Sequence, residues 1–270
     1  MRYKVLNFLY IFAVQKKNMD NMKKILKAVA VASVGAIMMN SCIYVNYSDG
    51  RRNRVTASGE DTTLVFENIA ATYDGIDISN NMIVKYTEDV SCITVTADKN
   101  LVPYIKIYLE DGELNLNERG IMMVNVPAAE VLVPVSSRPL ESIDVSGASK
   151  FTSDIILEGD DLSIDLSGAS RAEISVKVNE LEAEASGAST LNIGGTADEA
   201  EFDCSGASSI HCDEFSARTA RVDISGASKI GCLDSRSASG SVSGASHLSV
   251  KNGCNISKVS TSGASGISSK

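Results

Sequence analysis

The sequence Ser146-Gly147-Ala148-Ser149 decides the fold, because the same tetrapeptide returns six more times along the chain. The seven copies start at Ser146, Ser167, Ser186, Ser205, Ser225, Ser243 and Ser262. Successive copies begin 18 to 21 residues apart. A fixed period near 20 residues is typical of a solenoid, in which each repeat forms one coil that stacks on the coil before it.

Apolar residues recur at four fixed positions around each tetrapeptide. If the first serine is position 0, they stand at −3, −1, +5 and +7, as Ile164, Leu166, Ala172 and Ile174 do around Ser167. Polar residues lie between them, and this alternation is typical of strands with one buried face. We expect the glycine to relieve a corner, the alanine to face a narrow interior and the serines to hydrogen-bond within the turn. The sequence therefore predicts an all-β protein, a right-handed parallel β-helix with coils of about 19–21 residues.

The same frame extends upstream of the regular repeats. Residues 77–81 match residues 144–148 in order and type, with Asn80 standing where Gly147 stands in the later copy. Asparagine tolerates a left-handed backbone better than most residues, so this substitution suits a corner. We expect irregular coils of the same body over residues 59–135 and regular coils over 136–270. A separate small β domain over 59–135 is the alternative.

The N-terminal residues have the pattern of an export signal. Residues 22–41 begin with Lys23 and Lys24, continue as an apolar run and end with a small residue, Ser41, before Cys42. This pattern predicts a lipoprotein signal peptide, with cleavage before Cys42 and lipid on its sulfur. An ordinary signal peptide with an uninvolved cysteine is the alternative. Residues 1–21 are interpreted as a misassigned upstream start, and residues 42–58 as a tether.

The charge of the exported chain argues against nucleic acid as a partner. Residues 1–41 hold seven of the 25 basic and one of the 34 acidic side chains, so their removal leaves a net charge of −15. Such a surface repels phosphate backbones and anionic lipid head groups. We therefore expect contact with the membrane only through the lipid anchor.

Several short motifs in the N-terminal half resemble a known family. They span residues 66–69, 73–79, 93–98, 101–105 and 111–114. Together with the Ser-Gly-Ala repeats, they resemble the putative autotransporter adhesin, head GIN domain family, over roughly residues 62–265. Asp77 departs from the asparagine of the family's nickname. The resemblance implies a parallel β-helix on an exported envelope protein with an adhesin-like role.

One outward position carries an acid in five successive repeats. At position −2 stand Asp144, Asp165, Glu184, Asp203 and Asp223. If adjacent coils pair as parallel strands, these carboxylates lie about 4.8 Å apart, close enough to raise pKa values or to gather cations. Carboxylate oxygens suit Ca²⁺, so a weak calcium ladder is one interpretation. A solvated charged face without any ligand is the other, and no cofactor is otherwise expected.

The cysteines and histidines do not form a convincing reactive site. Cys212 and Cys232 share position +7 on consecutive coils and are predicted to be core thiols, with a disulfide as the alternative. Cys204 at −1 is also predicted to be buried, whereas Cys92 and Cys254 are left open. The two histidines, His211 and His247, stand at different outward positions and do not converge. We expect the many serines to be structural and the protein not to be an enzyme.

These observations favour a non-catalytic cell-envelope lipoprotein, an adhesin-like or scaffold module whose faces bind an envelope protein or glycan. One alternative is a polysaccharide lyase or glycosidase on the same fold, which would need a cleft of converging acids and bases. A second is a structural lipoprotein that associates with itself end to end through an open edge of the last coil. We expect anchoring in the outer membrane, with the periplasmic face favoured over the cell surface.

Overall fold

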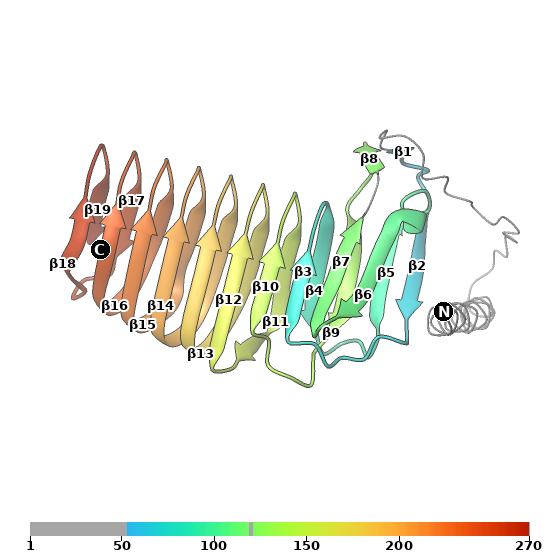
Figure 1. The fold of residues 1–270 in the computed structure, drawn as a ribbon, viewed down its shortest axis with the longest axis horizontal. Coiled ribbons are helices and arrows are strands. Elements are labelled where there is room, and N and C mark those ends of the chain that lie inside the picture. Colours follow the sequence, from blue (N-terminus) through green and yellow to red (C-terminus); the bar gives the residue numbers. More distant parts are fainter. Residues whose placement is uncertain (1–52, 119–120, 270) are drawn as a thin grey trace, which may run out of the picture. The chain divides into compact units, whose positions relative to one another are not determined.

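The computed structural model describes residues 53–118 and 121–269, and Cys42 and the signal region lie outside this part. The described chain is built almost entirely of strands (Figure 1). The strands are β1 (Asn53–Thr56), β2 (Asp61–Phe66), β3 (Gly75–Ile78), β4 (Met82–Thr87), β5 (Ile93–Asp98), β6 (Ile105–Glu110), β7 (Glu113–Glu118), β8 (Ile121–Val124), β9 (Ala129–Pro134), β10 (Ser142–Val145), β11 (Lys150–Glu158), β12 (Asp161–Leu166), β13 (Arg171–Ala185), β14 (Thr190–Cys204), β15 (Ser209–Ile224), β16 (Lys229–Val242), β17 (His247–Val250), β18 (Asn255–Thr261) and β19 (Gly266–Ser269). Within these residues, helix is limited to the three-residue turn η1 (Val102–Tyr104), far shorter than a membrane span requires.

The coils stack as the sequence predicts, in two parallel ladders on opposite sides of one core. We call the first ladder the row β7, β3, β10 and β12, then the second halves of β13 to β16, then β18. The second ladder runs through β9, β4 and β11, then the first halves of β13 to β16, then β17 and β19. The fold is therefore a parallel β-helix, and the prediction of its class is confirmed (Figure 1).

The four apolar positions of the repeat form the core. In the coil around Ser205, for example, Phe202, Cys204, Ile210 and Cys212 are all at most 1% exposed. The rings of Phe202 and Phe215 meet edge to face, 5.7 Å apart. Side chains from adjacent coils therefore fill the interior in stacked columns, which is the main source of stability in a solenoid.

The corner itself differs from the prediction in one respect. The alanine of the tetrapeptide, as in Ala148, faces solvent, and the second serine is the buried residue. This serine is no more than 2% exposed in six copies, namely Ser149, Ser170, Ser189, Ser208, Ser228 and Ser246. In Ser189 and Ser208 the hydroxyl turns back to donate to the carbonyl of the first serine of its own corner, at 2.8 and 2.7 Å. In these two copies the turn itself supplies an acceptor for the buried hydroxyl, whereas the Ser170 hydroxyl has no hydrogen-bond partner among the described residues.

The glycine of each corner has a left-handed backbone, with φ between 73° and 76° in all seven copies. At the earlier coil Asn80 takes the same conformation, with φ of 78°, and Asp77 pairs in register with Asp144. The amide of Ala148 donates to the Asn80 carbonyl at 2.6 Å, as later corners do to glycine carbonyls. The predicted extension of the frame to residue 77 is thus confirmed.

Antiparallel strands close the N-terminal end of the solenoid. On one side β6 pairs with β7, and on the other β5 pairs with β9 and β2 with β5. β1, which takes up residues from the end of the predicted tether, pairs separately with β8. This end of the body is therefore covered by strands that break the coil pattern.

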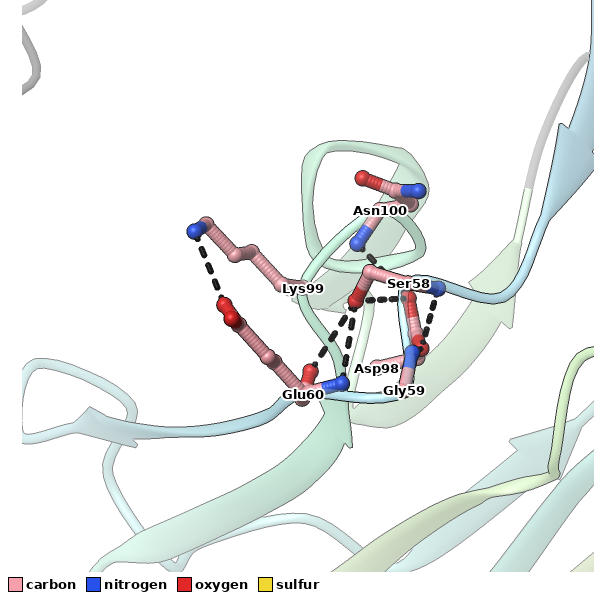
Figure 2. A network of polar contacts seen from close by, with 6 residues as sticks. All are labelled: Ser58, Gly59, Glu60, Asp98, Lys99 and Asn100. Carbon is pink, nitrogen blue, oxygen red and sulfur yellow. Dashed lines mark hydrogen bonds and ion pairs between the residues drawn. The ribbon is translucent and has the colours of Figure 1, made fainter.

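A buried carboxylate fixes the entry of the chain into this end (Figure 2). Asp98 is only 2% exposed and accepts hydrogen bonds from the amides of Ser58, Gly59 and Asn100 at 2.8 to 3.0 Å. The Ser58 hydroxyl donates to the same carboxylate at 3.0 Å, and Lys99 pairs with Glu60 at 3.1 Å. Burial raises the pKa of Asp98, but these hydrogen bonds outweigh it and hold the pKa below its usual value.

Residues 52–270 form one compact unit, and every core side chain described above belongs to it. We refer to this unit as the body. Because the core residues all lie within this unit, the body carries its own hydrophobic core and is suited to study by itself.

Candidate functional site

The outward side of the first ladder is strongly acidic, and we call it the acidic face. The predicted column at position −2 lies in register from coil to coil: Asp144 pairs with Asp165, and Glu184 pairs with Asp203. Asp165 also pairs with Glu184, and Asp203 pairs with Asp223, so the pairs form one series. Asp77, which the sequence analysis did not include, precedes Asp144 in the same column. Six carboxylates therefore form one continuous row.

Two further columns on the same face were missed. At position −6, Asp161, Glu180 and Glu199 lie in register, and at position −4, Glu182 pairs with Glu201. With the first row, these make eleven acids on neighbouring coils of one ladder. The frame that exposed position −2 predicts positions −4 and −6 to face outward as well, so extending the alternation by two steps would have found them.

A groove of about 420 Å³ runs across this face, open to solvent. Its lining includes Asp161, Glu180, Glu182, Glu199 and Glu201. The acids stand in rows along the stack, so they present a charged track rather than a single converging point. This geometry suits an extended partner lying across several coils.

Crowding of carboxylates raises pKa values in the N-terminal part of the row, from Asp77 to Glu184. Burial, followed by the charges of Asp165, Glu113 and Asp77, raises the pKa of Asp144 to about 6. The charge of Asp165 is the largest cause that raises the pKa of Glu184, and burial comes next. Repulsion between like charges therefore accumulates where no cation intervenes.

The negative charge at the C-terminal end of the row, around Asp223, is partly neutralised. Arg221, at position −4 of its coil, pairs with Glu201 at 3.0 Å and with Asp223 at 2.9 Å. The hydroxyl of Ser241 donates to Asp223 at 2.6 Å. Burial and the charge of Asp223 raise the pKa of Asp203, whereas Arg221 acts in the opposite direction. The strongest negative field therefore lies over the coils before Arg221.

The arrangement does not form a closed metal site. Among the described residues, no group of three or more histidine, cysteine or acidic side chains is placed to hold a metal ion. The acids form a row rather than a cage, so Ca²⁺ binding along it stays an untested prediction. A calcium site also needs several oxygens around one point.

A second groove of about 370 Å³ lies on the second ladder. It is lined by Glu173, Asn192, His211, Asp213 and Glu214, among others. Here the pairing of β14 with β15 shifts after Asn192, which interrupts the regular rows. His247 lies elsewhere, with its ring 2.9 Å from the Ser268 hydroxyl. The two histidines do not meet in the structure.

The cysteines partly follow the prediction. Cys204 and Cys212 are buried, but Cys232 is half-buried and has a left-handed backbone with φ of 56°. The pairing of β16 with β17 shifts between Ile230 and Leu233, so Leu233 takes the place in the core that was predicted for Cys232. No disulfide joins the cysteines of the described chain.

The fold and the acidic face define the described body as a β-helix that presents rows of charged side chains on its surface. The chain belongs to the putative auto-transporter adhesin, head GIN domain family, whose profile matches residues 72–254. This confirms the resemblance carried by the N-terminal motifs and the repeats. The relationship places the protein among exported envelope proteins with adhesin-like members.

Solved structures share the fold at low identity. A putative adhesin from Parabacteroides distasonis is 21% identical and covers 81% of this chain and 100% of its own, with a TM-score of 0.69. A putative adhesin from Bacteroides fragilis is 19% identical, covers 80% and 100%, and has a TM-score of 0.70. A putative lipid binding protein from Parabacteroides distasonis is 16% identical, covers 81% and 100%, and has a TM-score of 0.63. No functionally curated protein matches this chain.

Proposed function

We propose that the protein is a non-catalytic, adhesin-like module of the cell envelope that binds a cationic partner through the acidic face. The observation that carries this proposal is the in-register placement of eleven acids on one ladder. Rows of like charge cost stability, as the raised pKa of Glu184 indicates, since the charge of Asp165 is its largest cause. A partner that brings positive charge removes this cost on binding.

The groove indicates the form of the partner. Carboxylates repeat about every 4.8 Å along the stack, and the groove crosses several coils. An extended polypeptide segment rich in lysine or arginine would place charges over several coils at once. We therefore favour a basic segment of an envelope protein, and an amine-bearing glycan is the other partner that the experiment below distinguishes.

The proposal predicts that charge on the acidic face, and not total charge, controls binding. We expect the body to bind a ten-residue lysine peptide at 50 mM NaCl. A variant with Glu180, Glu182, Glu199 and Glu201 all changed to glutamine should bind about tenfold more weakly, since each exposed pair contributes about 0.3–0.5 kcal/mol. Calorimetry measures the difference.

A matched control changes the same number of charges on the second ladder. The variant with Glu130, Glu158, Glu173 and Glu214 changed to glutamine should stay within about twofold of the unchanged body, because electrostatic attraction falls off within a Debye length, about 14 Å at this salt concentration. In cells, a photo-crosslinking residue at Thr219, which lines the groove, should capture one protein species that a crosslinker at Thr196 does not. Equal binding by both glutamine variants would contradict the proposal, and capture of a glycan at Thr219 would replace the polypeptide partner.

We also propose that residues 22–41 are a lipoprotein signal peptide and that Cys42 carries the lipid. This interpretation rests on the sequence pattern around Cys42 and on the family's envelope location. It predicts an outer-membrane anchor, with the body on the periplasmic side. Changing Cys42 to serine should move the protein from the membrane to the soluble fraction, and protease treatment of intact cells should leave the anchored body uncut. Membrane retention of the serine variant would contradict the anchor.

The lipid-binding name of one structural relative is not carried over to this chain. The two grooves described above are lined mainly by charged and polar side chains. An acyl chain needs an apolar lining, because burying polar groups without partners is costly. The charges therefore favour the cationic partner.

A further inference from the structure

The chain between β17 and β18 makes an exposed turn in the last coils of the solenoid (Figure 1). The amide of Cys254 donates to the Lys251 carbonyl at 3.3 Å, so Asn252 and Gly253 form the tip of this turn. Both residues at the tip are exposed. They are also the only asparagine–glycine pair in the sequence. The turn therefore presents to water a side-chain amide that is followed by the least hindered of peptide nitrogens.

The backbone nitrogen of Gly253 is accessible. Glycine has no side chain to shield it, and even an added Cβ at Gly253 would meet no atom within 4 Å. Among the described residues, no acceptor receives a hydrogen bond from the Gly253 amide. The nitrogen can therefore lose its proton and react without first breaking a hydrogen bond of the fold.

The side-chain carbonyl of Asn252 is held and polarised by a residue of the next coil. The Ser269 hydroxyl, at the end of β19, donates to Oδ1 of Asn252 at 2.9 Å. A donor at this oxygen withdraws electron density from Cγ and stabilises the negative charge that appears on Oδ1 when a nucleophile adds to Cγ. The contact also restricts rotation of the side chain, so less freedom is lost when the reacting geometry is reached.

Two other exposed asparagines lack one or more of these features. Asn100 also lies in a turn, but the amide of Leu101 donates to the Asp98 carbonyl at 2.8 Å, and the Leu101 side chain is fully buried. Asn255 lies within β18 and is followed by the β-branched Ile256, whose side chain crowds its own backbone. These two asparagines are internal controls for the turn.

We infer that Asn252 is a site of spontaneous deamidation through a cyclic imide with Gly253. The Gly253 nitrogen gives its proton to water and bonds to Cγ of Asn252, and the side-chain nitrogen takes up a proton and leaves as ammonia. Water then opens the ring by adding hydroxide to one of its two carbonyl carbons and a proton to the ring nitrogen. Opening at Cγ gives aspartate, and opening at the backbone carbonyl gives isoaspartate, in which the chain runs through the former side chain. In sum, one water is consumed and one ammonia is released, with no oxidant or cofactor.

The product changes the charge of the last coils. No acid follows Asp234 in the sequence, so the new carboxylate would be the first one beyond it. Lys251 pairs with Asp234 at 3.2 Å, and a carboxylate at position 252 would compete for its ammonium group. Isoaspartate would also lengthen the turn by one backbone atom. None of these residues lines the groove of the acidic face, so the conversion is independent of the cationic partner.

Peptide mass spectrometry of the body, incubated at pH 8 and 37 °C, tests the proposal. Trypsin cuts after Lys251 and Lys258, so Asn252 and Asn255 lie in one short peptide and are distinguished by its fragmentation. We expect Asn252 to convert about tenfold faster than Asn255 or Asn100, because its nucleophile is unhindered and already adjacent. Both aspartate and isoaspartate should form, since the imide opens on either side. In water enriched in heavy oxygen the product should carry one heavy oxygen atom, which identifies conversion during the incubation.

Two variants separate the roles of the neighbours. Changing Gly253 to alanine places a methyl group beside the attacking nitrogen and should slow the reaction about tenfold. Changing Ser269 to alanine removes the donor to Oδ1 and should slow it about threefold, less than the loss of a buried oxyanion donor, because water partly replaces an exposed hydroxyl. In 6 M guanidinium chloride the serine variant and the unchanged body should react equally fast, since the contact exists only in the folded chain.

Two outcomes overturn the proposal. One is conversion of Asn252 no faster than that of Asn255 in the folded body. The other is formation of aspartate without isoaspartate, which would show direct hydrolysis of the side chain and no imide with Gly253. An unchanged rate in the folded alanine variant of Ser269 would overturn the part assigned to that hydroxyl.

Discussion

Changing Gly195 to alanine is expected to destabilise the body by about 3 kcal/mol or more. Gly195 lies within β14 with a backbone φ of 100°, and an added Cβ would overlap the carbonyl oxygen of Val176 on the preceding coil. Val176 is fully buried in the coil before it. The alanine must therefore push two hydrogen-bonded coils apart in addition to accepting a strained backbone. Urea unfolding measures the loss.

Gly253 supplies a matched control for this substitution. Its φ of 99° is nearly the same, but an added Cβ meets nothing within 4 Å. Alanine there should cost only the backbone strain, about 1–2 kcal/mol. The difference between the two losses in the free energy of unfolding gives the energy needed to push the coils apart at Gly195. Equal losses at Gly195 and Gly253 would show that the coils separate without resistance.

The body is expected to become less stable as the pH rises from 5 to 8. Burial raises the pKa of Glu118 to about 7, and burial with neighbouring charges raises that of Asp144 to about 6. Glu118 is 5% exposed, and neither carboxylate oxygen accepts a hydrogen bond from the residues that the structure describes. Both groups hold a proton in the folded chain at a pH where the unfolded chain has released it.

The direction of the effect follows from proton linkage. Stability falls with rising pH wherever the folded state binds more protons, here from about pH 4 up to the folded pKa values of about 6 and 7. We expect a loss of about 2 kcal/mol between pH 5 and 8, after halving the ideal value for solvent screening. Asp98 and Asp154 have lowered pKa values, so their contributions are lost only at lower pH.

Changing Glu118 to glutamine should remove about half of this pH dependence. The neutral side chain should raise the free energy of unfolding at pH 8 by about 1 kcal/mol and leave it nearly unchanged at pH 5. Changing the exposed Glu173 to glutamine is the control and should leave the slope unchanged, because water surrounds that side chain in both states. Thermal unfolding across the pH range measures both. If the free energy of unfolding of the unchanged body rose from pH 5 to 8, the raised pKa values of Glu118 and Asp144 would be refuted as the cause.

The sequence predicted the coils well because each one repeats the same alternation over a fixed period. Seven copies of one corner constrain the register even where a single copy is ambiguous, and the frame reached back correctly to Asp77. The alanine was placed on the wrong side because the chain turns within the tetrapeptide, so the strand alternation does not continue through it, and the second serine takes the buried position. Propensity alone favours alanine inside and serine outside.

Local departures from the repeat could not be predicted from a fixed alternation of apolar and polar positions. The left-handed backbone at Cys232 inserts one residue, so Leu233 fills the core. Nothing in the alternation marks this bulge, because both residues are apolar. The antiparallel strands at the N-terminal end and the hydrogen bonds of Asp98 to Ser58 likewise depend on contacts between residues far apart in the sequence. The acids Glu182 and Glu201 on the acidic face were missed because position −4 carries serine, arginine or lysine in the other repeats, so the sequence shows no continuous acidic column there.

The hydrogen bonds at the corners give the solenoid an electrical polarity. In each copy the alanine amide donates to the preceding coil, from Ala148 to Asn80 through to Ala264 to Gly244. The peptide dipoles of this corner column are aligned and add, whereas those of the strands alternate and nearly cancel, so the column leaves partial negative charge on the carbonyls of the final corner. Beyond Asp234, which pairs with Lys251 at 3.2 Å, the sequence carries Arg236, Lys251 and Lys258 and no acid. The column of corner peptides thus carries a dipole whose negative end lies in the coils where the side-chain charge is basic.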